Sequence, residues 1–380
     1  MQQIWALAMP DYFRVVCGTG EYSVEIGNGC CTKALNGKDP AQIIIICDSY
    51  FVLKYQELGW RTVAINSSES AKSLENMAEI IVALRNLKAD RTTDIIAIGG
   101  GVVQDVATFV SSVYMRGISW SYVPTTLLGM VDSCLGGKSS INVGQYKNLV
   151  GNFYPPGSIF VDLEFIKSLN AAQRSAGLCE AVKICFAHTG PAFDEFCQLN
   201  PLVSSGIDKY ESIISLCLRT KQWFIEVDEF DHKERLLLNF GHTFGHAIEG
   251  ASNFEIPHGV AVGIGMLAAI SFARSYNKLE PNQNRVKQLE TYILNIFKEV
   301  DELSKWTDQI DLEQLLDRFG SDKKHKNKHY VLIIPNSEGV LECIEVEKNC
   351  ANDALLKDSI LSAIAACQYC IPAGIVSQGN

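Results

Sequence analysis

The chain of 380 residues is 47% hydrophobic and carries a formal net charge of −10. That length and hydrophobic content are enough for a large core divided between two domains. The acidic balance argues against nucleic acid or an anionic membrane as a partner, because both attract basic surface. No run looks long and apolar enough for a membrane span and no signal sequence is visible, so the sequence predicts a cytoplasmic protein.

The 13 cysteines are scattered through mostly apolar stretches. In a chain without a signal sequence, such thiols are expected to be buried and reduced rather than joined in disulfides. Cys367 and Cys370 form a lone C-x-x-C pair, and a zinc ribbon would need a second pair. We interpret this pair as incidental, with a surface redox role as the weaker alternative.

The first part of the chain alternates between strand and helix patterns. Short strands with glycine turns are expected over residues 10–35; buried strands are predicted near 41–47 and 94–99, and helices near 70–88 and 102–115. A buried strand that ends in Gly99-Gly100-Gly101 and leads into a helix is typical of a nucleotide-binding α/β domain. The G-x-G-x-x-G fingerprint is absent, so a plain strand-to-helix turn remains an alternative.

Turns rich in hydroxyl groups, glycine and lysine follow. Thr125 and Thr126 end a short strand, where they can bind a ligand or cap the next helix. The sequence Gly136-Gly137-Lys138-Ser139 resembles the tail of a P-loop, but Asp132 stands where the first glycine would be, so we reject a P-loop. A lysine on this turn can still bind a phosphate.

From Phe165 onward the pattern is mostly helical, with one strand expected near residues 327–334. Helices are predicted near 171–188, 208–228, 232–250, 258–276, 282–303, 311–318 and 352–366. We therefore predict an α/β domain over residues 1–165 and a mainly α-helical domain over residues 166–380. The basic run over residues 322–328 is either a solvated loop or an anion clamp.

Two histidines of this helical half, His242 and His246, are four residues apart and share one face of a predicted helix. They are either hydrogen-bonded core side chains or groups that face a metal or an anionic substrate. His258 and Glu180 lie in further apolar runs. One carboxylate and two histidines form a common zinc shell with a position left for substrate, and we favour that interpretation.

With these residues assembled, the chain resembles the 3-dehydroquinate synthase family of sugar-phosphate cyclases. The matching segments run from Asp48 to about Lys324, and their order and spacing are far more specific than any single motif. The resemblance implies a Rossmann-like NAD-binding domain, a helical metal-binding domain and an active site in the cleft between them. It also implies a homodimer.

The resemblance assigns roles by position. The ligands of Zn²⁺ or Co²⁺ would be Glu180, His242 and His258. The NAD site would be lined by Asp48, Glu69, Lys72, Gly100, Gly101, Asp105, Thr125, Thr126 and Lys147. The substrate would be held by Asp132, Lys138, Asn148, Lys183, Lys221, Arg235, Asn239, His246 and Lys324, the last preferred over Lys323. Arg116 would reach the substrate phosphate from the partner subunit.

The implied reaction oxidises a ring alcohol, eliminates phosphate, reverses the oxidation and closes a carbocycle, so NAD ends unchanged. Retention of Arg235, Asn239 and His246 favours a phosphorylated sugar acid, because a guanidinium binds a carboxylate through two parallel hydrogen bonds. We expect 3-deoxy-arabino-heptulosonate 7-phosphate as substrate and 3-dehydroquinate, an intermediate of the shikimate pathway, as product. His246 would move a proton, since an imidazole has a pKa of about 6.5.

Some residues depart from the family pattern and leave the substrate open. Gln104, Ser139-Ser140 and the segment before Lys72 support, as an alternative, a specialised paralogue of secondary or surface-sugar metabolism. Such an enzyme would cyclise another sugar phosphate, as 2-deoxy-scyllo-inosose synthase or the sedoheptulose 7-phosphate cyclases do. A metal-dependent polyol dehydrogenase and a non-catalytic homologue are two further hypotheses for this chain.

Overall fold

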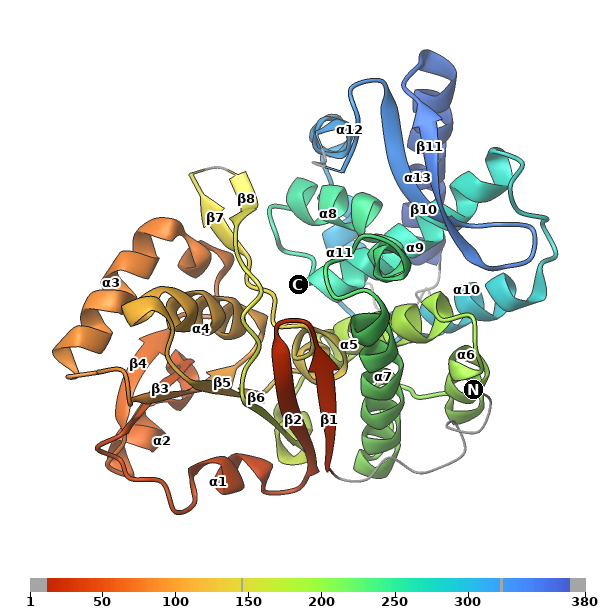
Figure 1. Ribbon diagram of the computed structural model, residues 1–380. Helices are drawn as coiled ribbons and strands as arrows, with labels where there is room; N and C mark the ends of the chain where they lie inside the picture. The colour runs from red at the N-terminus through yellow and green to blue at the C-terminus, as the bar shows by residue number, and fades with distance from the viewer. Residues whose placement is uncertain (1–11, 145, 322–323, 370–380) are drawn as a thin grey trace, which may run out of the picture. The chain divides into compact units, whose positions relative to one another are not determined.

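The computed structural model describes residues 12–144, 146–321 and 324–369, which form two compact units (Figure 1). Unit 1 holds the described residues up to Leu169 together with Ile207–Glu229. Unit 2 holds Asn170–Gly206 and the described residues from Phe230 onward. We predicted one boundary, near residue 165, and did not predict that residues 207–229 return to unit 1.

Unit 1 is built on a seven-stranded sheet in the order β1-β2-β9-β6-β5-β3-β4. Its strands are β1 (Tyr12–Cys17), β2 (Gly20–Gly27), β3 (Ile43–Asp48), β4 (Arg61–Ile65), β5 (Asp94–Gly99), β6 (Trp120–Pro124) and β9 (Ser158–Asp162). β1 runs antiparallel to β2, and the other neighbouring pairs are parallel. The buried strands predicted at β3 and β5 are confirmed. They are apolar along most of their length because a parallel sheet is covered on both faces.

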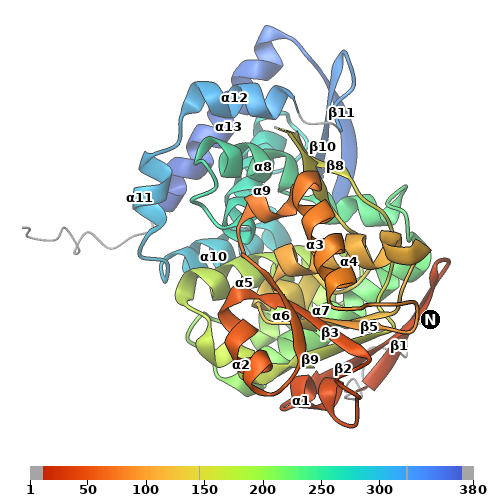
Figure 2. The ribbon, with the colours of Figure 1, turned by 90° about the vertical axis from the view of Figure 1, so that its left-hand side faces the viewer.

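Helices cover both faces of the parallel strands, as Figures 1 and 2 show. Helices α1 (Cys30–Leu35) and α2 (Val52–Glu57) lie on one face, and α3 (Leu74–Asn86) and α4 (Gly101–Val113) lie on the other. A hairpin of β7 (Ile141–Val143) and β8 (Tyr146–Val150) forms a separate small sheet. This doubly wound arrangement matches the predicted α/β fold class.

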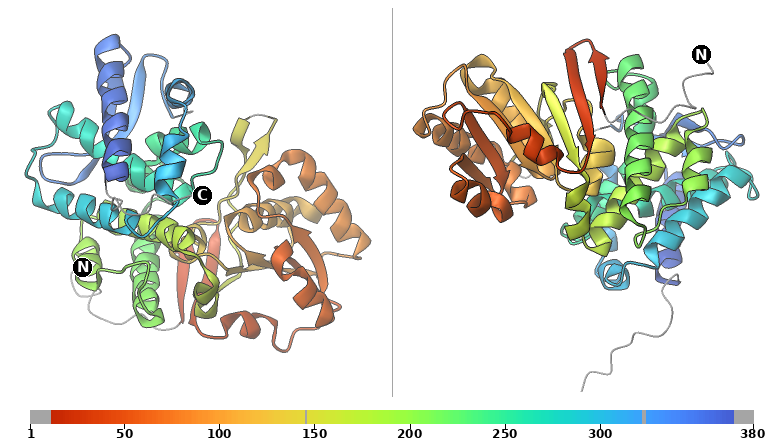
Figure 3. Two further views of the ribbon diagram at one scale, coloured as in Figure 1. Left: turned by 180° about the vertical axis from the view of Figure 1, so that it is seen from behind. Right: turned by 90° about the horizontal axis from the view of Figure 1, so that it is seen from below.

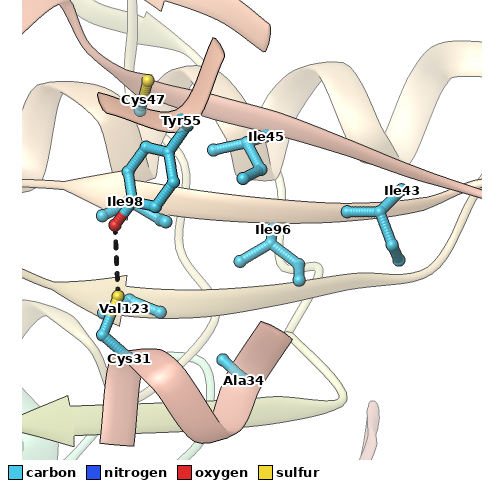
Figure 4. Packing of buried hydrophobic residues seen from close by; sticks show 9 residues of the cluster. All are labelled: Cys31, Ala34, Ile43, Ile45, Cys47, Tyr55, Ile96, Ile98 and Val123. Carbon is cyan, nitrogen blue, oxygen red and sulfur yellow. Dashed lines mark hydrogen bonds between the residues drawn. The ribbon is translucent and has the colours of Figure 1, made fainter. Parts of the chain in front are cut away.

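The apolar layer between α1, α2 and the sheet contains buried thiols (Figure 4). The Tyr55 hydroxyl lies 3.2 Å from the Cys31 thiol, and both groups are buried. Burial raises the pKa of the Cys47 thiol to about 12, so this thiol is neutral. Every cysteine in the described part of the chain is free and most are buried, including Cys367, which confirms the prediction. Cys370 lies outside the described residues.

Helix α7 (Ile207–Val227) belongs to unit 1, although two helices of unit 2 precede it. It packs against β1, β2 and a π-helical turn, η4 (Gly129–Ser133), and Figure 3 shows it beside the β1–β2 hairpin. Just beyond α7, the Glu229 carboxylate accepts hydrogen bonds from the main-chain N–H groups of Gly18 (2.5 Å) and Thr19 (3.2 Å). The antiparallel end of the sheet is therefore held by α7.

Unit 2 is mainly helical. Its elements are α5 (Ala171–Ala187), α6 (Ala192–Leu199), the 3-10 helix η6 (Glu234–Asn239), α8 (His242–Ala251), α9 (His258–Ser275), α10 (Asn284–Phe297), α11 (Leu303–Asp308), α12 (Leu312–Gly320), β10 (His329–Pro335), β11 (Leu341–Glu347) and α13 (Cys350–Tyr369). The late strand was predicted, but its antiparallel partner β11 was not, because exposed glutamates interrupt its apolar residues. Helix α9 lies at the centre and contacts α5, α8, α10, α13 and β10.

Helix α9 is long and apolar enough to cross a membrane by composition alone. The prediction that no segment reaches that threshold was therefore wrong. However, 78% of the helix is buried inside the protein, as expected for a helix that is apolar on all sides and forms the centre of a core.

Candidate active site

Four potential metal ligands from three helices of unit 2 lie close together. Glu180 is on α5, His242 and His246 are on α8, and His258 begins α9. One ring nitrogen from each histidine lies within 4.8 Å of the others. The Oε1 atom of Glu180 lies 3.5 Å from Nε2 of His258 and 3.8 Å from Nε2 of His242. Ligand atoms around a tetrahedral zinc are roughly 3.3 Å apart, so this donor set fits a divalent metal.

Close helix packing brings these ligands together. A Cβ atom on Gly259 would lie 2.1 Å from the main-chain oxygen of Ala176, and one on Gly265 would lie 2.1 Å from that of Gly241. Only glycine allows so close an approach of two backbones. The small residues of α9 therefore position it against α5 and against the start of α8, the helices that carry the other ligands.

The helix predicted over residues 232–250 is interrupted, and that prediction was wrong. Gly241 has φ +77° and separates η6 from α8. A side chain there would also collide with Met266 and with the main-chain oxygen of Val262. The break makes His242 the first residue of α8.

The charges around the ligands differ from one histidine to the next. The Lys183 ammonium donates a hydrogen bond to Oε2 of Glu180, and both side chains are almost fully buried. Burial and then the nearby Lys183 charge lower the pKa of His242 well below its ordinary value, so this imidazole is neutral, the form that binds metals. Burial also acts to lower the pKa of His258, but the carboxylates of Glu249 and Glu180 outweigh it and raise that pKa.

In unit 1, the strand order reverses between β3 and β5, and candidate cofactor residues lie at the carboxyl ends of these two strands. Asp48 ends β3, and its carboxylate accepts hydrogen bonds from the Tyr50 main-chain N–H (2.9 Å) and the Ser67 hydroxyl. Gly99 ends β5. Ligands of open α/β sheets bind at such a reversal point.

The three glycines after β5 have different surroundings. A Cβ atom on Gly99 would lie 2.5 Å from the Val103 side chain, and one on Gly100 would lie 3.0 Å from Thr126. One on Gly101 would meet nothing within 4 Å. The open space at the first residue of the 13-residue helix α4 fits the pyrophosphate of a dinucleotide, which main-chain N–H groups can bind there.

A network of charged and amide groups lies beside this turn. Lys72 is 2.8 Å from Asp105 and 3.5 Å from Glu69, while Lys147 is 3.6 Å from Glu69. Lys72 also donates a hydrogen bond of 3.5 Å to the Asn148 side chain. The network therefore joins residues 69–72, α4 and the β7–β8 hairpin.

Both pKa values of the Lys72–Asp105 ion pair are raised, which disfavours the charged carboxylate but favours the charged ammonium. Burial raises the pKa of Asp105 to about 6 despite the neighbouring Lys72. The charged form of this carboxylate is therefore unfavourable at its buried position. The pKa of Lys72 is nevertheless raised, because the carboxylates Asp105 and Glu69 together outweigh its burial. The two shifts are compatible, because Lys72 interacts with two carboxylates, whereas Asp105 shares the Lys72 ammonium with Glu69.

Residues 62–176 match the family model described as 3-dehydroquinate synthase N-terminal, and residues 177–325 match that described as 3-dehydroquinate synthase C-terminal. The chain belongs to the 3-dehydroquinate synthase family. It is therefore an enzyme of the phosphate-eliminating cyclase kind, as predicted. The resemblance and the fold class inferred from the sequence are both confirmed.

Curated relatives named 3-dehydroquinate synthase cover most of the chain. That of Sulfolobus acidocaldarius is 37% identical over 78% of this chain and 84% of its own length. That of Saccharolobus solfataricus is 34% identical over 89% of this chain and 96% of its own length. That of Helicobacter pylori is 34% identical over 77% of this chain and 82% of its own length.

Solved structures of other cyclases share the fold. A 2-deoxy-scyllo-inosose synthase has a TM-score of 0.78 with 24% identity and covers 92% of this chain and 99% of its own. The 2-epi-5-epi-valiolone synthase of Streptomyces hygroscopicus, solved with NAD⁺ and Zn²⁺, has a TM-score of 0.72 with 22% identity and covers 90% and 97%. A probable glycerol dehydrogenase of Sinorhizobium meliloti has a TM-score of 0.61 with 11% identity and covers 91% and 97%, so this fold also occurs in dehydrogenases.

One residue beside the histidines of this 3-dehydroquinate synthase family member was not predicted. Oε2 of Glu249 lies 3.1 Å from Nδ1 of His258. A carboxylate on the second ring nitrogen fixes the orientation of a metal-bound histidine. A signal was present in the sequence, because Glu249 follows His242 by seven residues and shares its helix face.

The remaining predicted residues of unit 2 have mixed surroundings. The Lys324 charge contributes to the lowered pKa of His242, after the larger effects of burial and of other charged groups, whereas Lys323 lies outside the described residues. Arg235 is buried in η6, and its Nε atom lies 3.0 Å from Oδ1 of Asp231. The Asn239 side chain donates to the main-chain oxygen of Leu236 at 3.1 Å. The roles of Arg235 and Asn239 in substrate binding stay predictions.

Two predicted substrate residues of unit 1 form a largely buried ion pair. The Lys221 ammonium of α7 donates to the side chain and to the main-chain oxygen of Asp132 in η4. The Nζ atom of Lys138 lies 5.8 Å from the centre of the Phe153 ring. Arg116 is exposed and has φ +68°, an uncommon conformation for a residue other than glycine.

The two threonines after β6 make local hydrogen bonds. The Thr126 hydroxyl accepts from the Gly129 main-chain N–H at 3.1 Å, so it caps η4. The main-chain N–H of Thr125 donates to the main-chain oxygen of Gly99 at 3.0 Å. The capping role therefore describes Thr126, and contact of either threonine with a cofactor stays a prediction.

Proposed function

We propose that this enzyme is a 3-dehydroquinate synthase. It would convert 3-deoxy-arabino-heptulosonate 7-phosphate to 3-dehydroquinate and inorganic phosphate with NAD and one divalent metal, Zn²⁺ or Co²⁺. The observation that carries the proposal is the grouping of Glu180, His242 and His258 beside the buried Lys183. The curated relatives of that name support the same substrate.

The two cofactors would be held by different units. Glu180, His242 and His258 would bind the metal, and Asp48, Gly100, Gly101 and the Lys72–Asp105 network would bind NAD. When bound, NAD supplies a reversible hydride acceptor and the metal supplies a Lewis acid for alcohol and carbonyl oxygens.

The protein's own side chains would orient the substrate and balance its charge. Lys138, Arg116 and Lys324 would neutralise the phosphate, so that it leaves from a fixed position. His246 would hold and release a proton, because its exposed ring lies 5.3 Å from the ring centre of His242 and 5.6 Å from that of His258.

One observation favours a second candidate, a cyclase of a neutral sugar phosphate. Arg235 is the residue expected to bind the substrate carboxylate, but its buried guanidinium already forms an ion pair with the partly exposed Asp231. A guanidinium balanced by a carboxylate attracts a second carboxylate less strongly. If Arg235 keeps that partner when substrate binds, a neutral sugar phosphate becomes the better substrate.

The test is a direct comparison of substrates. Purified protein with NAD and Zn²⁺ would be given the heptulosonate phosphate, sedoheptulose 7-phosphate or glucose 6-phosphate, with released phosphate and carbocyclic product measured by mass spectrometry. We expect turnover of the heptulosonate phosphate and loss of turnover in Arg235→Met. Turnover of only a neutral sugar phosphate would favour the second candidate, and net NADH formation with a polyol would favour a dehydrogenase.

We also infer a homodimer of the cytoplasm that acts in the shikimate pathway and supplies aromatic amino acid biosynthesis. The curated relatives support the pathway, and the family resemblance supports the homodimer. Light scattering on the purified protein would give the oligomeric state, and a monomer at micromolar concentration would contradict the homodimer.

A further inference from the structure

Gln104 makes a reciprocal pair of hydrogen bonds between α4 and η4. Its Nε2 atom donates to the main-chain oxygen of Ser133 at 2.6 Å, and the Ser133 hydroxyl donates to its Oε1 atom at 2.6 Å. Because a main-chain oxygen can only accept, the orientation of the amide is fixed by its chemistry. Gln104 is 4% exposed, so both ends of a buried amide are satisfied. We call this pair of contacts the clasp.

The clasp satisfies a carbonyl at the end of an irregular turn. In η4 the Cys134 N–H donates to the oxygen of Gly129, five residues back, at 3.1 Å. Carbonyl groups at the end of a helical turn need partners from outside it. Gln104 provides one for Ser133, and Lys221 provides one for the oxygen of Asp132. Two side chains from other helices thus fix consecutive peptide units.

Asp132 lies between these two supports. Its side chain receives the Lys221 ammonium, and the next residue along the chain is held by Gln104. Short π-helical turns are rare and often occur at functional sites, where they direct a side chain that a regular helix would direct elsewhere. A shift of the turn would move the Asp132 carboxylate and Lys221 together.

We propose that Gln104 is a positioning residue for the substrate site, because its clasp with Ser133 holds the π-helical turn that presents Asp132 and Lys221. This inference rests on the proposed function, in which those two residues hold the sugar phosphate. Gln104 itself touches neither substrate nor NAD in this proposal. It acts on substrate affinity through the turn.

The test compares variants that open the clasp with one that costs stability elsewhere on α4. Gln104→Leu keeps the side-chain size but removes both hydrogen bonds, Ser133→Ala removes one of them, and Ser133→Thr keeps the hydroxyl. The matched control is Thr108→Val, since the buried Thr108 hydroxyl donates only to the main-chain oxygen of Gln104 within α4, at 2.8 Å. Each holoenzyme would be measured for KM and kcat with the heptulosonate phosphate, NAD affinity, Tm and amide hydrogen exchange over residues 129–135.

We expect Gln104→Leu to raise KM about tenfold, as the loss of one or two buried hydrogen bonds implies, with kcat and NAD affinity changed less than about threefold. Ser133→Ala should raise KM by a smaller factor and add little to Gln104→Leu in the double variant, because both open the same clasp. Ser133→Thr and Thr108→Val should keep the wild-type KM. Exchange over residues 129–135 should be faster in Gln104→Leu than in the Thr108→Val control.

An unchanged KM in Gln104→Leu, or an equal rise in Thr108→Val, would overturn the positioning role. If Gln104→Leu does not fold, Ser133→Ala against Ser133→Thr decides by the same criterion. A wild type that releases no phosphate contradicts the proposed function, and the exchange data then judge the clasp alone. In that case, unchanged exchange over residues 129–135 in Gln104→Leu would show that the clasp does not hold the turn, and faster exchange would show that it does.

Discussion

The imidazole of His258 lies between two carboxylates, with Nδ1 3.1 Å from Oε2 of Glu249 and Nε2 3.5 Å from Oε1 of Glu180. Glu249 comes from α8 and Glu180 from α5, while His258 begins α9. The orientation of one proposed ligand therefore depends on a residue outside the proposed ligand set.

We expect Glu249→Ala to weaken Zn²⁺ binding by about 10–100-fold, because a metal-bound histidine loses its orientation when the partner of its second nitrogen is removed. Equilibrium dialysis against a competing chelator would measure the affinity. The exposed Glu255 offers a matched control, since Glu255→Ala removes the same charge near the same helices. Equal affinity in Glu249→Ala and wild type would contradict the role of Glu249.

The assignment of three ligands among four candidates predicts different results for two histidines. His258→Ala should lose bound Zn²⁺ and turnover together with the fold intact, because a three-ligand site does not tolerate removal of one ligand. His246→Ala should keep Zn²⁺ and lose turnover. Mass spectrometry would measure the metal content of both variants, and circular dichroism would show whether each one is folded. Loss of metal from His246→Ala but not from His258→Ala would make His246 the ligand.

The glycine turn after β5 predicts two contrasting alanine variants. Gly101→Ala should keep the wild-type Tm, because its Cβ atom meets nothing within 4 Å, but should weaken NAD binding by filling the space proposed for the pyrophosphate. Gly99→Ala should lower the Tm, since its Cβ atom would lie 2.5 Å from Val103. Fluorescence titration with NAD and thermal unfolding would measure both. Wild-type NAD affinity in Gly101→Ala would show that the cofactor binds elsewhere.

The buried Asp105 predicts a dependence of stability on pH. Its pKa of about 6 in the folded protein lies above the ordinary value of 3.8, so folding favours the protonated form. The stability that it contributes is fully present below the ordinary pKa and is lost as the pH rises through 6. Relative to Asp105→Asn, the wild-type free energy of unfolding should therefore fall by about 2 kcal/mol between pH 4 and pH 6.

Urea unfolding of the metal- and NAD-free protein at several pH values would check this difference. Lys72→Met supplies an internal control, because removing the ammonium 2.8 Å away should raise the Asp105 pKa further and move the change to higher pH. If the wild type and Asp105→Asn ran parallel at every pH, folding would not raise the Asp105 pKa, and the prediction would be wrong.

The sequence was most informative where structure is decided locally. The continuous apolar runs of β3 and β5 predicted buried parallel strands, because a strand covered on both faces is apolar at successive positions. Long helices such as α5 and α9 were also predicted, and α5 begins with a capping box formed by Asn170 and Gln173. Local patterns thus recovered most of the elements of each unit.

Features that depend on distant contacts were not predicted. Glycine is needed at residue 241 because α9 passes so close that a side chain would meet Met266, and the positive φ of Gly241 separates η6 from α8. The contact between Gln104 and Ser133 joins residues 29 positions apart, and no spacing rule connects them. For the candidate site, the histidine and carboxylate positions were inferred, whereas the support given by Glu249 and the ion pair between Arg235 and Asp231 required coordinates.

The return of α7 to unit 1 limits how the two units can be separated. The chain passes from one unit to the other after Leu169, after Gly206 and again after Glu229. A single cut at any of these points leaves an incomplete half, since a fragment ending at Leu169 lacks the helix that packs on β1, β2 and η4. Neither unit can therefore be exchanged with a relative as one continuous gene segment, and the two are expected to be inherited together.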